Sequence, residues 1–169
     1  MPADAKGVSG LLALFRDTGG NQNPFRHGWT RMQERSGVDK ESGRRIYLGE
    51  DVEYLTASII GAAFEVSNIL GHGFLEDVYR KALIHELYIR GLSCGEEVPF
   101  EVSYKDVVLG RYLCDLLVEG TVVVELKAVN QLNSSHVGQL LNYLKAAGLK
   151  VGLLFNFGRP RLEYRRALI

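Results

Sequence analysis

Three segments rich in Val, Leu and Tyr succeed one another between residues 98 and 129, with only short polar turns between them. Turns this short join antiparallel neighbours, so the three segments are predicted to form a β meander. The predicted strands are residues 98–104, 107–118 and 121–129. The meander limits the fold, because it must be covered by helices or by a second sheet.

Helical segments supply that cover. Apolar residues recur at helical spacing in residues 52–70, 75–90 and 134–148. A short apolar strand at residues 151–155 follows the last helix, and residues 162–168 are a candidate final strand. A strand reached through a crossover helix is usually parallel to one already in the sheet. The order helix, helix, three-strand meander, helix, strand therefore predicts an α/β fold with a central mixed β-sheet flanked by helices.

The patterned chain begins near residue 51, so residues 51–169 are predicted to form one domain. Residues 1–50 hold eight glycines and show no sustained period, and they are expected to be a loosely ordered N-terminal extension. The first apolar stretch, residues 11–15, is too short for a signal sequence or a membrane span. We therefore expect a cytoplasmic protein without a membrane partner. Its two cysteines, Cys94 and Cys114, are expected to be reduced thiols.

Charge gives little guidance about partners. Lys and Arg together number 20, as do Asp and Glu, so the net charge of the chain neither indicates nor excludes binding to nucleic acid. The last eleven residues carry four arginines against one glutamate. That basic end could contact phosphates, although a solvated surface is the more common explanation.

The stretch V-V-V-E-L-K-A-V at residues 122–129 places two charges in an apolar strand. Glu125 and Lys127 point to the same face, because strand side chains alternate. Asp115 interrupts the preceding strand. A two-residue turn between the strands would put Asp115 and Glu125 on opposite faces, so bringing them together requires a three-residue loop or a bulge.

Two carboxylates and an ammonium group on one face have a recognisable chemistry. Mg²⁺ or Mn²⁺ prefers oxygen ligands and takes one or two carboxylates together with water and a substrate phosphate. Lys127 could hold the scissile phosphate and orient the attacking water. On spacing alone, a structural ion pair between Lys127 and either acid is the better-supported alternative.

Two helices carry further candidates. Gln139 and Tyr143 share a helix face, with His136 one turn earlier, and could contact a nucleotide or simply face solvent. Glu76 and Tyr79 lie three apart at the start of the second helix. An acid there is favoured by the helix dipole, which gives Glu76 a purely local alternative.

Several ordered motifs in the chain resemble one family. They are G-F-L-E-D-V-Y at residues 73–79, D-L-L-V, V-V-V-E-L-K-A-V, H-V-G-Q-L-L-N-Y-L-K and V-G-L-L-F-N-F-G. Over residues 53–168 the chain resembles the GxxExxY proteins, which are similar to the PD-(D/E)xK nuclease superfamily, including its subgroup with a RecB-like QxxxY element. The resemblance implies a restriction-endonuclease-like core, although Cys114 stands where the usual pattern has a proline.

The resemblance also implies roles for individual residues. Asp115, Glu125 and Lys127 would be catalytic, and Glu76 would join Asp115 and Glu125 as a metal ligand. Supporting or substrate-binding roles fall to the residues Gln139, Tyr143, His136 and Tyr79.

The resulting hypothesis is a Mg²⁺- or Mn²⁺-dependent nuclease acting on nucleic acid, with DNA as the first expectation. The alternative is a non-catalytic module of the same fold that binds nucleic acid or a protein partner. A two-carboxylate glycosidase would explain neither Lys127 nor the Gln139–Tyr143 helix. Strand preference, sequence preference and the occurrence of a homodimer stay open.

Overall fold

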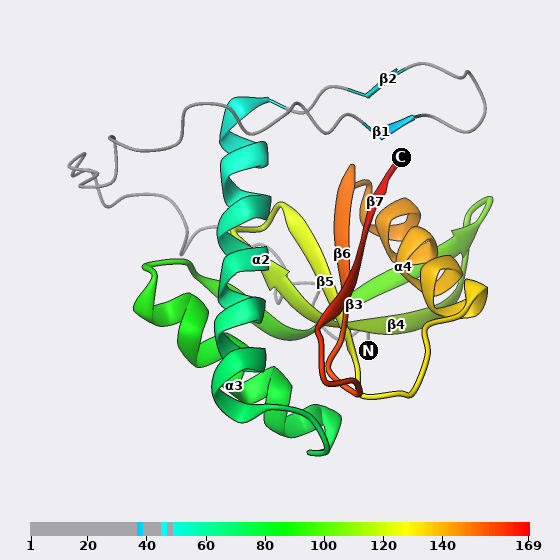
Figure 1. The fold of residues 1–169 in the computed structure, drawn as a ribbon. Coiled ribbons are helices and arrows are strands. Elements are labelled where there is room, and N and C mark those ends of the chain that lie inside the picture. The colour runs from blue at the N-terminus through cyan, green and yellow to red at the C-terminus, as the bar shows by residue number, and fades with distance from the viewer. Residues whose placement is uncertain (1–36, 39–44, 47–48) are drawn as a thin grey trace, which may run out of the picture. The chain divides into compact units, whose positions relative to one another are not determined.

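The computed structural model describes residues 37–38, 45–46 and 49–169. These described residues lie in one compact unit. Its main elements are α2 (Glu50–Leu70), α3 (Glu76–Ile89), β3 (Cys94–Tyr104), β4 (Val107–Val118), β5 (Val122–Lys127), α4 (Ser134–Ala147), β6 (Val151–Asn156) and β7 (Glu163–Leu168) (Figure 1). The predicted order is confirmed, including the final strand.

The sheet is mixed, as predicted. Its strand order is β3-β4-β5-β6-β7. β5 and β6 are parallel and are joined through α4, whereas the other neighbouring pairs in this sheet are antiparallel. A parallel pair brings the ends of β5 and β6 to the same edge of the sheet, so the chain segments that leave Lys127 and Asn156 start side by side.

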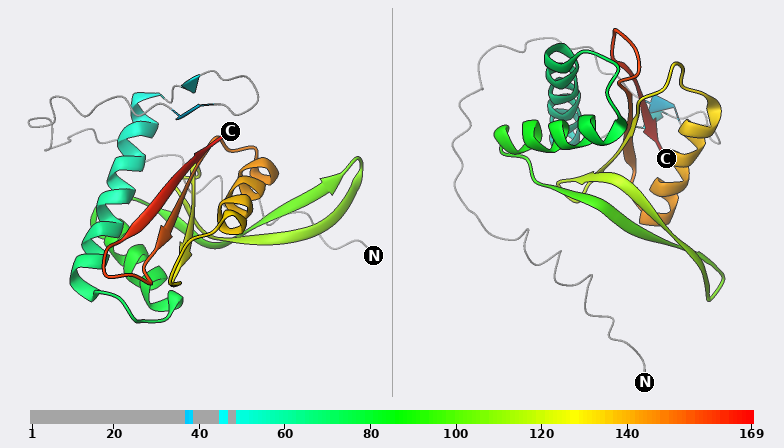
Figure 2. Two further views of the ribbon diagram at one scale, coloured as in Figure 1. Left: turned by 45° about the vertical axis from the view of Figure 1, so that its right-hand side comes forward. Right: turned by 90° about the horizontal axis from the view of Figure 1, so that it is seen from below.

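Helices cover both faces of the sheet, so the core has two layers of apolar side chains (Figure 2). On one face, α2 and α3 bury Ile59 and Leu83 against the even-numbered residues of β5. On the other face, α4 buries Leu140 against Val123 and Leu154. The near-continuous apolar run of β5 follows from this cover, because a strand buried on both faces shows no polar alternation.

A three-residue loop joins β4 to β5. Val118 pairs with Val122, which leaves residues 119–121 as the loop. Glu119 and Gly120 are both left-handed there, with φ of 50° and 60°. This register puts Asp115 opposite Glu125, so the requirement stated from the sequence is met.

The pairing of β4 with β5 is short. It comprises three residue pairs from Val118 to Leu116, whereas β4 stays paired with β3 along nearly its whole length. Beyond Leu116 the β3–β4 hairpin therefore diverges from β5, and its outer part extends away from the other strands (Figures 1 and 2). The sheet forks at Asp115.

Two differences from the predicted elements concern short segments. β3 begins at Cys94, four residues earlier than predicted, and includes Glu97 at a left-handed φ of 49°. That part of the strand contains Gly95 and two glutamates, residue types that are uncommon in strands, so the sequence pattern did not indicate it. A two-stranded antiparallel pair, β1 (Gly37–Val38) and β2 (Arg45–Ile46), also occurs where no strand was predicted, because two-residue strands are too short to show a period.

Three further expectations concern the N-terminal extension, the two cysteines and membrane-spanning helices. The predicted loose extension at residues 1–50 lies mostly outside the described residues. Both cysteines are free; Cys114 is buried and Cys94 half-buried. Within the described part of the chain, every helix is too short or too polar to cross a bilayer.

Candidate active site

The fork in the sheet is closed by two carboxylates. The Asp115 N–H donates to Oε1 of Glu125 at 3.3 Å, and the Leu126 N–H donates to Oδ2 of Asp115 at 2.7 Å. Each acid thus accepts a hydrogen bond from the backbone of the opposite strand, at the point where backbone pairing stops. The structure brings the two predicted acids together through these contacts.

Lys127 lies at the end of β5, on the face that carries Glu125. Its Nζ is 3.4 Å from Oε2 of Glu125 and 4.0 Å from Oε1 of Glu76. The lysine side chain is 15% exposed and the Glu125 side chain 2%. One ammonium group therefore lies between an acid of the sheet and an acid of α3, which assembles three of the predicted site residues.

Electrostatics mark Glu125 as the perturbed acid. Burial and the neighbouring charge of Asp115 raise its pKa to about 8, against the smaller opposing effects of Lys127 and of the Asp115 N–H. Burial alone would lower the pKa of Lys127, but the nearby carboxylates of Glu125, Glu76 and Asp115 outweigh it and the pKa is raised. Lys127 therefore stays an ammonium group at neutral pH. The carboxyl groups of Glu125 and Glu76 are its acidic neighbours.

Helix α4 brings a phenol to the same place. Nε2 of Gln139 donates to the Tyr143 hydroxyl at 2.8 Å, which confirms the predicted shared face. Burial, together with the charges of Glu125 and Asp115, raises the pKa of Tyr143. Tyr143 packs in the same buried cluster as Cys114, and its ring lies 6.4 Å from that of Tyr112, so the Gln139–Tyr143 pair lies beside β4 where the sheet forks.

His136 caps the same helix. The Asn133 side chain accepts from the backbone N–H groups of Ser135 and His136, and Nδ1 of His136 accepts from the Asn133 N–H at 3.3 Å. This reciprocal arrangement is a capping box and fixes the start of α4. The described contacts of His136 are those of the cap, and its role toward substrate stays a prediction.

Helix α3 supplies Glu76 from its first turn and Tyr79 from its buried side. Glu76 is the first residue of the helix, where the dipole favours an acid, and its side chain is 43% exposed. Tyr79 is fully buried and stacks on Phe157 at 4.7 Å. Its hydroxyl donates to the Gly71 carbonyl and accepts from the Phe74 N–H. These contacts give Tyr79 a structural role in the loop before Glu76.

The segment after Lys127 is held by residues that the sequence did not reveal as part of the site. Oδ1 of Asn156 accepts from the N–H groups of Val129 and Gly158, both at 3.0 Å. The Phe157 N–H donates to the Lys127 carbonyl at 2.7 Å. A buried asparagine at the end of an apolar strand was the available signal, since such a side chain needs partners.

A divalent cation fits this donor set in part. Asp115 and Glu125 supply paired carboxylates next to the single ammonium group, and Mg²⁺ commonly takes one or two carboxylates with water. As the side chains stand, no three His, Cys, Asp or Glu residues in the described part of the chain group closely enough to hold a metal ion. Glu76 contacts Lys127, so its place in a three-acid set stays a prediction.

Comparisons with known proteins identify the family of the chain. A family model of the PD-(D/E)XK nuclease superfamily matches residues 53–167. Among solved structures, the crystal structure of SSO0001 is similar with a TM-score of 0.46 and 20% identity, over 69% of this chain and 60% of that chain. The comparison with curated proteins found no match. The family match spans both helices before the sheet, the forked sheet and α4, and the chain belongs to the PD-(D/E)XK nuclease superfamily.

Proposed function

We propose that this protein is a nuclease that hydrolyses phosphodiester bonds of nucleic acid, DNA in the first instance, with Mg²⁺ or Mn²⁺. The observation that carries the proposal is the pairing of Asp115 with Glu125 at the fork, with the Lys127 ammonium group 3.4 Å from Glu125. A divalent cation, when bound, would neutralise charge on the phosphate and favour ionisation of a water molecule.

The two acids are the residues that would hold the cation. Their oxygens are already fixed by the N–H groups of Asp115 and Leu126, so little reorganisation is needed to present them. Glu125 is 1% exposed and would otherwise keep its proton near neutral pH, as its raised pKa indicates. A buried acid of this kind gains from a cation that stabilises its charged form.

Lys127 would act on the phosphate. Its raised pKa keeps it protonated, so it is suited to balance negative charge on the pentavalent transition state and to orient water, and less suited to remove a proton. Glu76 holds the ammonium group from the α3 side, and Gln139 with Tyr143 lies beside the acids for contact with a nucleotide. These contacts support the tasks proposed for Lys127, Glu76, Gln139 and Tyr143, whereas the contacts of His136 and Tyr79 are structural.

The test is hydrolysis by purified protein. Labelled single-stranded and double-stranded DNA and RNA are incubated with Mg²⁺ or Mn²⁺, and products are resolved on denaturing gels. Wild-type protein should cleave at least one substrate, and Lys127→Ala should lose about 10²-fold or more in rate. Lys145→Ala, which removes an exposed lysine at the far end of α4, is the matched control and should cleave normally.

Two outcomes would count against the proposal. Intact substrates across all nucleic acids and both metals would contradict hydrolysis, and tight binding without hydrolysis would indicate a non-catalytic module instead. Equal rates for the wild type and Lys127→Ala would show that any cleavage has another source.

A further inference from the structure

The proposed active site repels the molecule it must bind. Glu76, Asp115 and Glu125 face one ammonium group, and the whole chain is electrically neutral. Nucleic-acid affinity comes mainly from cations that neutralise backbone phosphates. Positive charge is therefore needed near the site but outside the acidic cluster.

The β6–β7 loop leaves the sheet directly beside Lys127. Asn156, the last residue of β6, pairs with Lys127 in the parallel ladder, so the loop starts at the same edge as the site. Two residues on, Gly158 packs against the chain that follows Lys127. A Cβ atom at Gly158 would lie 2.4 Å from both N and O of Val129, so only glycine allows this approach.

The loop and the strand β7 that follows it carry four arginines. Of the four between residues 159 and 169, two have acidic partners. Arg165 pairs with Glu163 at 2.9 Å, and Arg166 forms a two-pronged pair with Glu53 of α2. Arg159 and Arg161 are exposed, and neither forms a salt bridge or a side-chain hydrogen bond with any residue that the structure describes.

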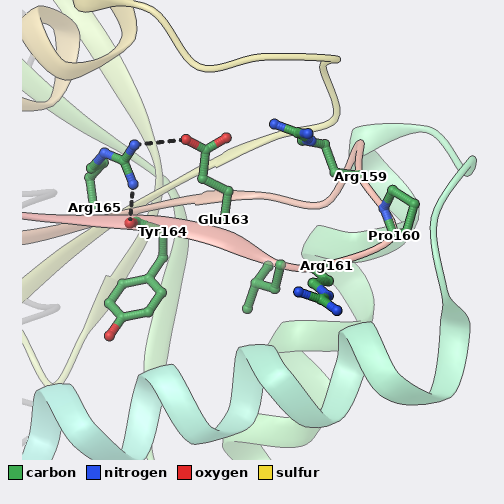
Figure 3. Close-up of a pocket in the computed structure, with 7 residues that line it drawn as sticks. Arg159, Pro160, Arg161, Glu163, Tyr164 and Arg165 are labelled. Atoms are coloured by element: carbon green, nitrogen blue, oxygen red, sulfur yellow. Dashed lines mark hydrogen bonds and ion pairs between the residues drawn. The ribbon is translucent and has the colours of Figure 1, made fainter.

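The two unpaired arginines face outward on opposite sides of the loop. Figure 3 shows Arg159 on the side of the Glu163–Arg165 pair, whereas Arg161 projects on the side of α2. Glu163 is the ladder partner of Asn156, and Asn156 is the partner of Lys127, so the side of Arg159 continues the face that carries the lysine. Residues 159–165 also line an open hollow beside this edge.

We propose that Arg159 and Arg161 bind backbone phosphates of the nucleic-acid strand next to the phosphate that is cut. The inference rests on the proposed nuclease function and adds the surface that holds its substrate. Arg159, on the face of Lys127, contacts the phosphate nearer the site, and Arg161, on the other side of the loop, contacts one farther along the strand where the strand passes around the loop. Planar guanidinium groups suit such paired contacts with phosphate oxygens.

The clamp at Asn156 explains how an exposed loop can serve this purpose. The hydrogen bonds from Val129 and Gly158 to one side-chain oxygen, together with the Phe157–Lys127 backbone bond, fix the loop to the strand that carries the lysine. The start of the loop is therefore fixed beside the strand that carries the ammonium group, and loop and lysine would engage one phosphate chain together.

The experiment measures equilibrium binding apart from cleavage. Fluorescein-labelled 30-residue single-stranded DNA, the matching duplex and RNA of the same sequence are titrated by anisotropy in EDTA, over a series of salt concentrations. A plot of log affinity against log salt concentration has a negative slope. Each phosphate contact contributes about −0.7 to this slope on a single strand and about −0.9 on a duplex. In the double variant Arg159→Ala, Arg161→Ala, the magnitude of the slope should decrease by the contribution of one to two phosphate contacts. Binding should weaken equally for all sequences.

Controls separate this from a general loss of charge or fold. Lys150→Ala removes one exposed cation at the opposite end of β6 and should keep the wild-type slope. Arg159 and Arg161 are exposed and unpaired among the described residues, so the double variant should unfold at the wild-type temperature. Arg159→Glu, Arg161→Glu should weaken binding further than the alanine pair.

The outcomes distinguish the surface from the activity. An unchanged salt slope in the double variant, or no binding of any probe by the wild type, overturns the proposed surface even if cleavage is observed. A lowered slope in a protein that cleaves nothing supports the surface and contradicts the nuclease. Where cleavage occurs, the variant should raise KM and leave kcat nearly unchanged.

Discussion

Asp115 and Glu125 each place a carboxylate oxygen on a backbone N–H of the opposite strand, at 3.3 Å for the Asp115 N–H and 2.7 Å for the Leu126 N–H. These contacts take the place of the backbone pairs that end at Leu116 and Val124. The acids therefore satisfy the donors that the fork leaves open, and the proposed function adds a second task, in which their remaining oxygens would hold a cation.

The two tasks can be separated at Asp115. Asp115→Asn keeps an oxygen for the Leu126 N–H, so it should retain the wild-type unfolding temperature while losing cation binding and cleavage. Asp115→Ala leaves that partly buried N–H unpaired and should cost about 1–3 kcal/mol in addition. Urea denaturation and a cleavage assay on both variants check this, and equal stability of the two variants would contradict the structural task.

Stability should depend on pH through Glu125. Without a cation, the pKa of Glu125 is about 8 in the folded protein, whereas its ordinary pKa of 4.5 applies to the unfolded chain. The folded state thus binds more protons between these values. The contribution is full below pH 4.5 and is lost as pH rises toward 8, by up to about 1.4 kcal/mol per pH unit.

Glu125→Gln isolates this effect, because an amide cannot ionise and its oxygen can still accept from the Asp115 N–H. The free energy of unfolding of wild type and of Glu125→Gln is measured in EDTA at several pH values. From pH 5 to pH 8 the wild type should lose stability relative to Glu125→Gln. A difference that stays constant over that range would show that the pKa of Glu125 is not raised.

The length of the β4–β5 loop should control the site. After deletion of Gly120, a loop that keeps three residues pairs Val118 with Val123, so Leu126 comes opposite Asp115. Glu125 then moves to the other face, and apolar side chains enter the wrong layer. We expect loss of cleavage together with severe destabilisation. Gly120→Ala keeps the length and meets no neighbouring atom, so it should cost only about 1 kcal/mol through its left-handed φ of 60°. Cleavage by the deletion variant at the wild-type rate would contradict the register argument.

Close packing at Gly158 should position Lys127. Gly158→Ala would push a Cβ into the backbone of Val129 and displace the chain just after the lysine, so kcat should fall. Gly138→Ala in α4 is the matched control: its Cβ meets nothing within 4 Å, and alanine should stabilise the helix by up to about 1 kcal/mol. Equal kcat values for Gly158→Ala and wild type would remove Gly158 from the account.

Sequence patterns predicted the larger elements because these elements have strong periods. α2, β4 and α4 lie within two residues of their predicted bounds, and the parallel pairing of β6 with β5 followed from the crossover helix. From the sequence, a three-residue loop or a bulge was the condition for Asp115 and Glu125 to meet, and the structure has the loop. Spacing alone could not decide whether Asp115 and Glu125 lie on the same face of the sheet or on opposite faces.

The parts that sequence patterns missed depend on tertiary contacts. An asparagine at the end of an apolar strand signals a need for partners, but the residue order does not show that one partner is Val129, which lies 27 residues earlier after Lys127. The burial of Tyr79 against Phe157 is of the same kind. Likewise, the short contact between Lys127 and Glu76 depends on how α3 docks on the sheet, which no spacing rule describes.

The most direct test of the central claim is calorimetric titration of Mn²⁺ onto wild-type protein and onto Glu125→Gln at pH 8. The account predicts a divalent-cation site on the wild type, formed by Asp115 and Glu125, whose affinity falls by at least about tenfold when the amide replaces the carboxylate. Absence of Mn²⁺ binding to the wild type, or equal affinity in both proteins, would contradict the account.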